Sequence, residues 1–174
     1  GGSHVHNLQH FVPAETYFES NPEWFSLNKN GKRNPDQLCL SNEEAVQKWI
    51  DAVKQWLNNS PNAELISVSQ NDNSVECYCD ECLQVASEEG GTSSGIYMRF
   101  VNKVADAIKE EYPNILVDNL AYRMTRGAPT NTAPSENVMI RLCSFEVCFS
   151  HPLNECIAET NDTNTSGKTF VEDI

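Results

Sequence analysis

The sequence predicts an α/β protein in which parallel strands alternate with amphipathic helices. Two helices, each with one apolar face, are predicted over residues 41–57 and 96–112. A mostly apolar segment follows each helix, at residues 65–68 and 114–122, and such segments are typical of strands whose sheet is buried on both faces. This order of elements indicates a parallel sheet or a (β/α) barrel.

The N-terminal segment, residues 4–13, is predicted to be the first strand, because apolar residues alternate imperfectly with histidines up to a proline. Alternation places His4, His6 and His10 on one face. Contact with a substrate and simple lining of a polar pocket are equally favoured there, and metal binding is less favoured. Residues 28–33 are expected to form a turn in a surface loop.

The helix over residues 41–57 has the clearest boundaries. Ser41 is expected to be its N-cap, with Glu44 three residues later in a capping box. The last predicted strand covers residues 138–143, and the segment before it, with its glycine and prolines, is expected to be a loop rather than a helix. The C-terminal residues 170–174 are expected to begin a further helix.

Four predicted strands are too few for a closed barrel, which needs eight strands and usually ~250 residues. The chain has 174 residues and 39% hydrophobic residues, enough for one domain with an ordinary core. We therefore expect residues 1–174 to be a single domain, a partial TIM barrel of about four strands cut from a longer chain that supplies the remainder of the barrel. A small open sheet is the alternative.

The charge of the chain excludes some partners. Its 12 basic and 25 acidic residues give a formal net charge of -13, which repels phosphate backbones, so we expect no nucleic-acid partner. No apolar run approaches the ~20 residues that cross a bilayer, so we expect no membrane span.

Seven cysteines, an odd number, cannot all pair within one chain. Cys77, Cys79 and Cys82 are close enough in sequence to ligate one metal ion together. Structural zinc and disulfides that hold this loop to the rim of the barrel are equally favoured, and redox catalysis is less favoured than either. The fourth zinc ligand is expected to be a histidine or one of Cys39, Cys148 and Cys156.

Polar side chains follow the strand at residues 65–68. Asn71, Asp72 and Asn73 come where this strand should end, and ligands of parallel α/β proteins bind at that edge of the sheet. Turn chemistry alone also accounts for this tripeptide. The nearby cysteines favour the interpretation as a site.

Short segments spread over most of the chain allow a comparison with known families. They are residues 6–13, 22–25, 31–33, 37–42, 67–72, 77–82 and 146–153. Together and in this order, they resemble the bacterial domain-of-unknown-function family 4838, a glycoside-hydrolase-like barrel. The resemblance implies a TIM barrel related to those of α-glucuronidases and hexosaminidases, carbohydrate as the ligand, and an extracytoplasmic or secreted location.

Glycoside hydrolysis needs two carboxyl groups and no cofactor. Asp72 and Glu146 are the candidate catalytic pair, because each follows a predicted strand on the same expected edge. Asp118 is a third candidate, although its place inside a strand favours a structural role. Arg123 is suited to pair with the carboxylate of a uronic acid. The expected substrate-binding residues are His6, Asn71, Tyr122, Arg123 and His151.

Two other functions stay open on the sequence. A non-catalytic carbohydrate-binding or scaffold barrel would lack a facing pair of carboxylates. A zinc-stabilised interaction module would bind metal through its cysteines and have no ligand cleft. The primary expectation is a glycoside-hydrolase-like domain that acts on or binds carbohydrate containing uronic acids or amino sugars.

Overall fold

The computed structural model of the chain describes residues 5–144, 147, 150 and 152–155. Its elements, in chain order, are α1 (Leu8–Phe11), α2 (Ala14–Tyr17), η1 (Pro22–Trp24), β1 (Phe25–Leu27), β2 (Arg33–Leu38), α3 (Glu43–Asn58), β3 (Leu65–Ser67), α4 (Asp80–Glu88), α5 (Ser94–Ile108), β4 (Leu116–Ala121), η2 (Arg123–Thr125), β5 (Val138–Leu142) and η3 (Leu153–Glu155).

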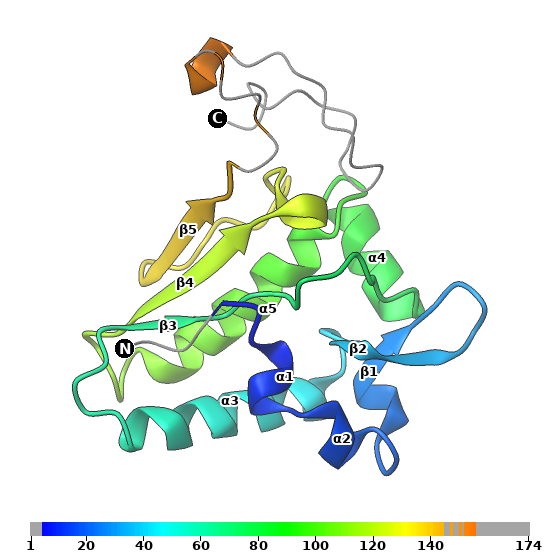
Figure 1. Cartoon of the computed structure of the whole chain (residues 1–174), viewed down its shortest axis with the longest axis horizontal. Coiled ribbons are helices and arrows are strands. Elements are labelled where there is room, and N and C mark those ends of the chain that lie inside the picture. The colour runs from blue at the N-terminus through cyan, green and yellow to red at the C-terminus, as the bar shows by residue number, and fades with distance from the viewer. Residues whose placement is uncertain (1–4, 145–146, 148–149, 151, 156–174) are drawn as a thin grey trace.

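Strands β3, β4 and β5 form a parallel sheet in that spatial order (Figure 1). The predicted strands at residues 65–68, 114–122 and 138–143 are confirmed. Helices α4 and α5 connect β3 to β4, whereas a loop with η2 connects β4 to β5, as the glycine and prolines there predicted. The fold is therefore mixed α/β, and within the described residues the sheet is open rather than closed into a barrel.

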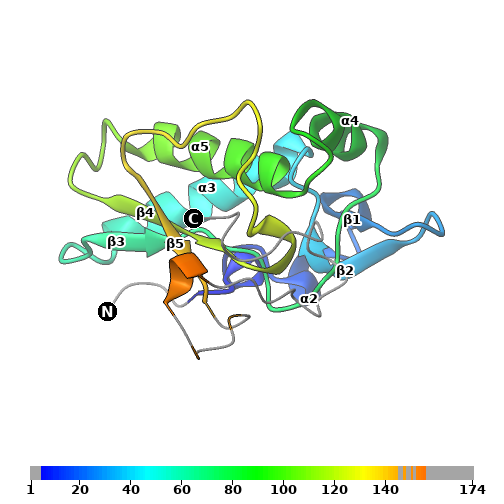
Figure 2. The same ribbon diagram turned by 90° about the horizontal axis from the view of Figure 1, so that it is seen from above.

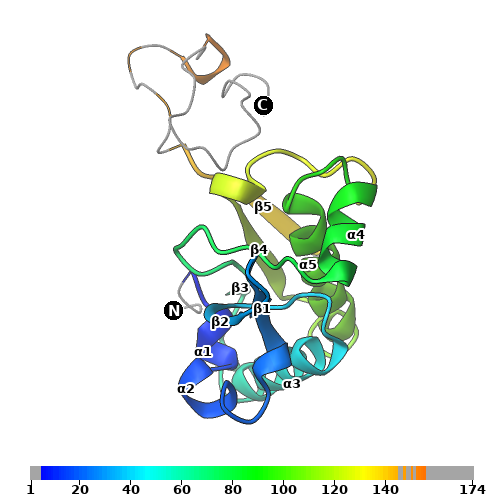
Figure 3. The same ribbon diagram turned by 90° about the vertical axis from the view of Figure 1, so that its right-hand side faces the viewer.

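Helices α3 and α5 pack on the same side of this sheet (Figures 2 and 3). Trp49 of α3 is fully buried between them and meets the rings of Phe11 at 4.8 Å and Phe100 at 5.3 Å, both edge to face. Its indole nitrogen donates a hydrogen bond to the carbonyl of Leu8 at 3.2 Å. One side chain thus joins α1, α3 and α5 into a single core. None of the described helices is long and apolar enough to cross a membrane.

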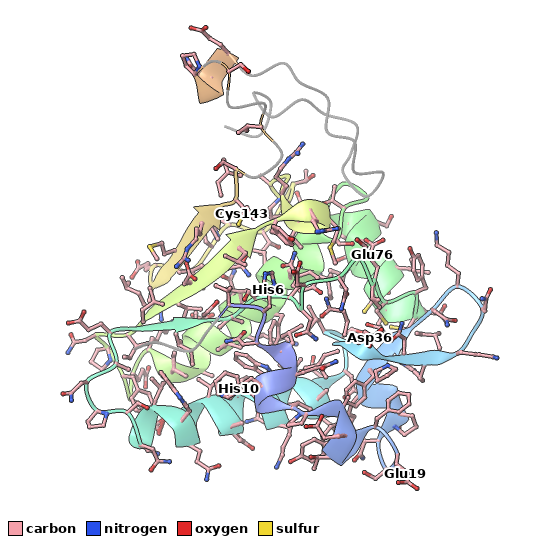
Figure 4. The ribbon with its side chains drawn as sticks, in the orientation of Figure 1. His6, His10, Glu19, Asp36, Glu76 and Cys143 are labelled. Carbon is pink, nitrogen blue, oxygen red and sulfur yellow. The ribbon has the colours of Figure 1, made fainter. Side chains whose placement is uncertain are left out.

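The predicted N-terminal strand is wrong. Leu8 and Phe11 lie one helical turn apart in α1, and both are buried in the core. Because residues three apart lie on the same side of a helix, one helical turn buries both side chains. The imperfect alternation of apolar residues and histidines therefore did not indicate a strand. His6 and His10 consequently do not share a face, since His10 is exposed on α1 and His6 lies beside the end of β3 (Figure 4). His4 lies outside the described residues.

The segment before α3 contains a hairpin that the sequence did not predict. Strands β1 and β2 pair in antiparallel fashion around the turn expected at residues 28–33. Strand β2 is largely polar, which hid it from a search for apolar alternation. Helix α4 was also missed. Asn42, rather than Ser41, is the N-cap of α3, and its side-chain oxygen accepts from the amide of Ala45 at 2.9 Å.

A buried glutamate fixes the corner between α4 and α5. The Glu89 side chain is fully buried and accepts hydrogen bonds from Arg99 at 2.7 Å, Thr132 Oγ1 at 2.6 Å and the Asn131 amide at 2.9 Å. These partners lower the pKa of Glu89 to about 2. Gly95 of α5 leaves room for this side chain, because a Cβ at that position would overlap it. Glu89 therefore ties the loop between β4 and β5 to the helical layer.

Acid should reveal the contribution of Glu89 to stability. Its folded pKa of about 2 lies below the ~4.3 of an unfolded glutamate, so its contribution is fully present above pH ~4.3 and is lost as the pH falls toward ~2. We expect Glu89→Gln to lower the free energy of unfolding at neutral pH, and the difference from wild type to shrink across that window in urea titrations. Glu110→Gln, an exposed change, serves as the control. A difference independent of pH would contradict this account.

Candidate functional site

Two predicted site residues meet at the carboxyl edge of the sheet. Because β3 and β4 are parallel, the segments that follow them emerge at the same edge. The hydroxyl of Tyr122 donates a hydrogen bond to Asp72 Oδ1 at 2.7 Å, and Asp72 is exposed. Burial raises the pKa of Tyr122, so its phenol stays protonated as the donor. The site therefore presents a carboxylate whose position is fixed by a phenol.

Arg123 completes the polar group from the next position along the chain. Its Nε donates to the Tyr122 hydroxyl at 3.0 Å, and its Nη1 lies 3.4 Å from the Ser74 hydroxyl. The guanidinium also lies 5.3 Å from the centre of the Tyr122 ring. The Tyr122 hydroxyl thus accepts from Arg123 while it donates to Asp72, and the three side chains form one hydrogen-bonded chain.

His6 approaches the same group from the N-terminal segment. Its amide donates to the Ser69 hydroxyl at 2.8 Å, and its Nδ1 lies 2.8 Å from the carbonyl oxygen of Gln70. A carbonyl only accepts, so Nδ1 carries a hydrogen and donates it to Gln70. The ring meets that of Tyr122 edge to face at 5.4 Å. The structure therefore brings together four of the residues that the sequence selected.

Both described non-glycine residues with positive φ belong to this site. They are His6, with φ of 59°, and Arg123, with φ of 51°. Residues with a Cβ rarely adopt this left-handed conformation, which costs ~1–2 kcal/mol for each. Such strain persists where the surroundings over-determine it, and it gathers at binding and catalytic sites.

Asn71 occupies a different place from the one predicted. It is buried, and its side-chain nitrogen donates to the carbonyl of Asp36 at 2.7 Å. Its amide group therefore binds the β1–β2 hairpin instead of lining the open edge beside Asp72. Asp118 is fully buried within β4 and pairs with Arg141 at 3.1 Å, while burial raises its pKa. The sequence-predicted residues Glu146 and His151 lie outside the described residues.

Four cysteine sulfurs converge between the hairpin and α4. Cys39, Cys77, Cys79 and Cys82 place their sulfurs within 4.8 Å of one another. Cys39 Sγ lies 3.6 Å from Cys79 Sγ and 3.9 Å from Cys82 Sγ. Zinc–sulfur bonds of ~2.3 Å in a tetrahedron put neighbouring sulfurs ~3.8 Å apart, whereas a disulfide needs ~2.05 Å. All four thiols are free, and their geometry suits a metal ion rather than disulfides.

The surroundings of the cluster stabilise negative sulfur. The Leu27 amide donates to Cys77 Sγ at 3.3 Å, and the Ser41 hydroxyl lies 3.2 Å from Cys82 Sγ. Cys79 is the N-cap of α4 and Cys82 lies in its first turn, where the helix dipole favours anions. These are the outer contacts expected around metal-bound thiolates. The hydroxyl expected to cap α3 thus faces the cysteines instead.

Without a cation, Cys39, Cys77 and Cys82 compete for protons. The hydrogen bond that Cys77 donates to Cys39 raises the pKa of Cys77 to about 12 and lowers the pKa of Cys39. The pKa of Cys82 is also raised, first by its hydrogen bond to Cys39. A divalent cation offers all four sulfurs the positive partner that protons otherwise supply.

Sequence reasoning left out the residues that support both sites. Cys39 was one of several candidates for the fourth ligand, whereas Gln37 was not predicted to support either site. Gln70, fully buried, was also missed, although its side chain donates to the Tyr122 carbonyl at 2.8 Å. Gln37 and Cys39 lie in one of the segments that carry the family resemblance. That resemblance was the signal in the sequence that could have identified them as supporting residues.

A model of the family described as "Domain of unknown function (DUF4838)" matches residues 2–173. None of the curated proteins matches the chain. The family match spans nearly the whole chain, so it includes both the polar group at the sheet edge and the four cysteines.

The strain at Arg123 is measurable by a matched pair of substitutions. Arg123→Gly and Arg123→Ala remove the same side-chain contacts, but only alanine keeps a Cβ at φ of 51°. We expect the glycine variant to be more stable than the alanine variant by about 1 kcal/mol in urea unfolding. Equal stabilities would show that the backbone relaxes out of the left-handed region once the guanidinium is gone.

Proposed function

The chain belongs to the DUF4838 family, and we propose that its domain binds and hydrolyses carbohydrate at the carboxyl edge of β3 and β4. The observation that carries the proposal is the convergence of His6, Asp72, Tyr122 and Arg123 on a strained backbone. These side chains come from three separate segments. They meet at the edge at which parallel α/β proteins bind ligands.

The chemistry of the four side chains favours a sugar. A carboxylate and an imidazole nitrogen accept hydrogen bonds from hydroxyl groups, a guanidinium donates them, and a tyrosine ring offers an apolar face. Arg123 adds a planar cation suited to the carboxylate of a uronic acid. A uronic-acid-containing glycan is therefore the substrate class that we propose.

In the proposed reaction, Asp72 and Glu146 act across one glycosidic bond. One carboxyl group gives its proton to the leaving oxygen, and the other attacks the anomeric carbon or activates a water molecule. Water supplies the hydroxyl group of the new reducing end and restores the proton of the acid. The hydrogen bond from Tyr122 fixes Asp72 Oδ1 and leaves Oδ2 to face the sugar.

Asp72→Asn should remove turnover and Tyr122→Phe should weaken binding. On aryl glucuronides, with the full-length protein, we expect Asp72→Asn to lower kcat by ~10²–10⁴-fold. Tyr122→Phe removes the hydroxyl that joins Arg123 to Asp72, and we expect glucuronate to bind about tenfold more weakly in calorimetry. Asp51→Asn, exposed on α3, is the control.

The outcomes separate the alternatives. Unchanged turnover in Asp72→Asn would contradict the catalytic role. Glucuronate binding that depends on Tyr122, with no turnover even in wild type, would favour the non-catalytic carbohydrate-binding domain. Equal glucuronate affinity in all variants would contradict the proposal that carbohydrate binds at this edge of the sheet.

We propose further that the cluster of Cys39, Cys77, Cys79 and Cys82 is a structural zinc site. The sulfur separations of 3.6 and 3.9 Å support this proposal, because they bracket the edge of a zinc–thiolate tetrahedron. Four cysteines fill the coordination sphere, which is the arrangement of structural rather than catalytic zinc. The metal would therefore stabilise the fold and take no part in bond cleavage.

Metal analysis tests the zinc site directly. We expect one zinc ion per chain after purification under reducing conditions, and a loss of most of this zinc in Cys39→Ser. Cys143→Ser, at a cysteine outside the cluster, should keep its zinc. Cobalt should replace zinc and give the thiolate-to-metal charge-transfer bands of a four-sulfur site. Full zinc content in Cys39→Ser would contradict the proposed ligand set.

A further inference from the structure

The segment from Gln70 to Cys79 connects the two sites. Asp72 lies near its beginning, and Cys77 and Cys79 lie at its end, just before α4. The β1–β2 hairpin contacts this segment at both places, through Asp36 at Asn71 and through Leu27 at Cys77. The β1–β2 hairpin thus contacts the segment both beside Asp72 and beside the cysteines.

Gln37 of β2 holds the residues on each side of Asp72. Its side chain is buried, and its Nε2 donates to the Asn71 carbonyl at 3.1 Å and to Asn73 Oδ1 at 3.0 Å. Its Oε1 accepts from the Asn71 amide at 3.2 Å. The neighbouring Asp36 carbonyl accepts from the side chains of Asn71 and Asn73, at 2.7 and 3.1 Å. Asp72 is therefore placed by its neighbours, which are fixed to the hairpin.

The sulfur end is joined to the same hairpin. Cys39 comes two residues after Gln37, and Leu27 on β1 exchanges hydrogen bonds with the segment. The Tyr78 amide donates to the Leu27 carbonyl at 2.7 Å, and the Leu27 amide donates to Cys77 Sγ at 3.3 Å. One metal ion bound by Cys39 and by the three later cysteines would lock the hairpin onto the segment. One path from that metal to Asp72 runs through Cys39, Gln37 and Asn71.

We propose that metal at the four cysteines, acting through Gln37, positions Asp72 for ligand binding. The hairpin is either docked on the segment, with Gln37 bonded to Asn71, or undocked, with both amide groups in water. Metal shifts this equilibrium because it binds only when Cys39 is docked. The affinity of the sugar site then falls in proportion to the docked fraction when metal is removed. This consequence rests on the proposed carbohydrate function.

The rate of amide hydrogen exchange over residues 71–75 reports how firmly the segment around Asp72 is held, and it can be measured without any sugar. We expect exchange in this segment to become at least tenfold faster when zinc is stripped with a chelator, and to recover when zinc is restored. Gln37→Ala should show the same increase while keeping its zinc, because its sulfurs are intact. Gln47→Ala, a glutamine exposed on α3, is the matched control. The β4 amides report whether the fold survives each treatment.

Glucuronate binding, measured on the same samples, is expected to weaken at least tenfold in zinc-free protein and in Gln37→Ala. Unchanged exchange over residues 71–75 on zinc removal would overturn the proposal, as would equal glucuronate affinity with and without zinc. Zinc-dependent exchange with no glucuronate binding in any form would support the positioning and contradict the carbohydrate function. If stripping zinc unfolds β4, Gln37→Ala decides alone, and normal exchange in that variant would overturn the proposal.

Discussion

The structure depends on how the irregular segment from Gln70 to Cys79 satisfies its polar groups. This segment is neither helix nor strand, yet Gln70, Asn71 and Cys79 are buried. Buried backbone groups without partners would cost ~1–3 kcal/mol each. The β1–β2 hairpin provides the partners through Leu27 and Gln37. The hairpin is thus a required part of the site, although it contributes nothing to the parallel sheet.

This requirement explains the buried polar residue of β2. A strand that packs only on a core alternates apolar and polar residues, whereas Gln37 is buried so that its amide can bond to the Asn71 backbone. A side chain that bonds to a distant loop, as Gln37 does, interrupts the alternation of apolar and polar residues in its own strand. Such exceptions are expected where a fold supports a site.

The parts predicted from the sequence are those whose cause is local. Periodic apolar residues predicted α3, α5 and the three parallel strands, and the strand-end rule selected Asp72 and Glu146. The sequence-based predictions were wrong or incomplete where a partner distant in the sequence determines the conformation or role of a residue. The carbonyl of Leu8 accepts a hydrogen bond from Trp49 of α3, and the Ser41 hydroxyl faces the cysteines instead of capping α3. Gln37 and Cys39 gain their roles from residues 34 to 43 positions away, which no local pattern reveals.

The left-handed backbone at His6 and Arg123 needs a structural cause, because together they cost ~2–4 kcal/mol in a fold stabilised by ~5–15 kcal/mol. Gln70 provides one. Its carbonyl accepts from His6 Nδ1 at 2.8 Å, and its side chain donates to the Tyr122 carbonyl at 2.8 Å and to Thr125 Oγ1 at 3.0 Å. Tyr122 and Thr125 flank Arg123. One fully buried glutamine therefore holds both strained positions, and it directly precedes Asn71, the first residue that the hairpin fixes. The geometry of the site thus follows from three consecutive residues with different partners. Gln70 bonds to His6 and Tyr122, Asn71 bonds to the hairpin, and Asp72 accepts from the Tyr122 hydroxyl.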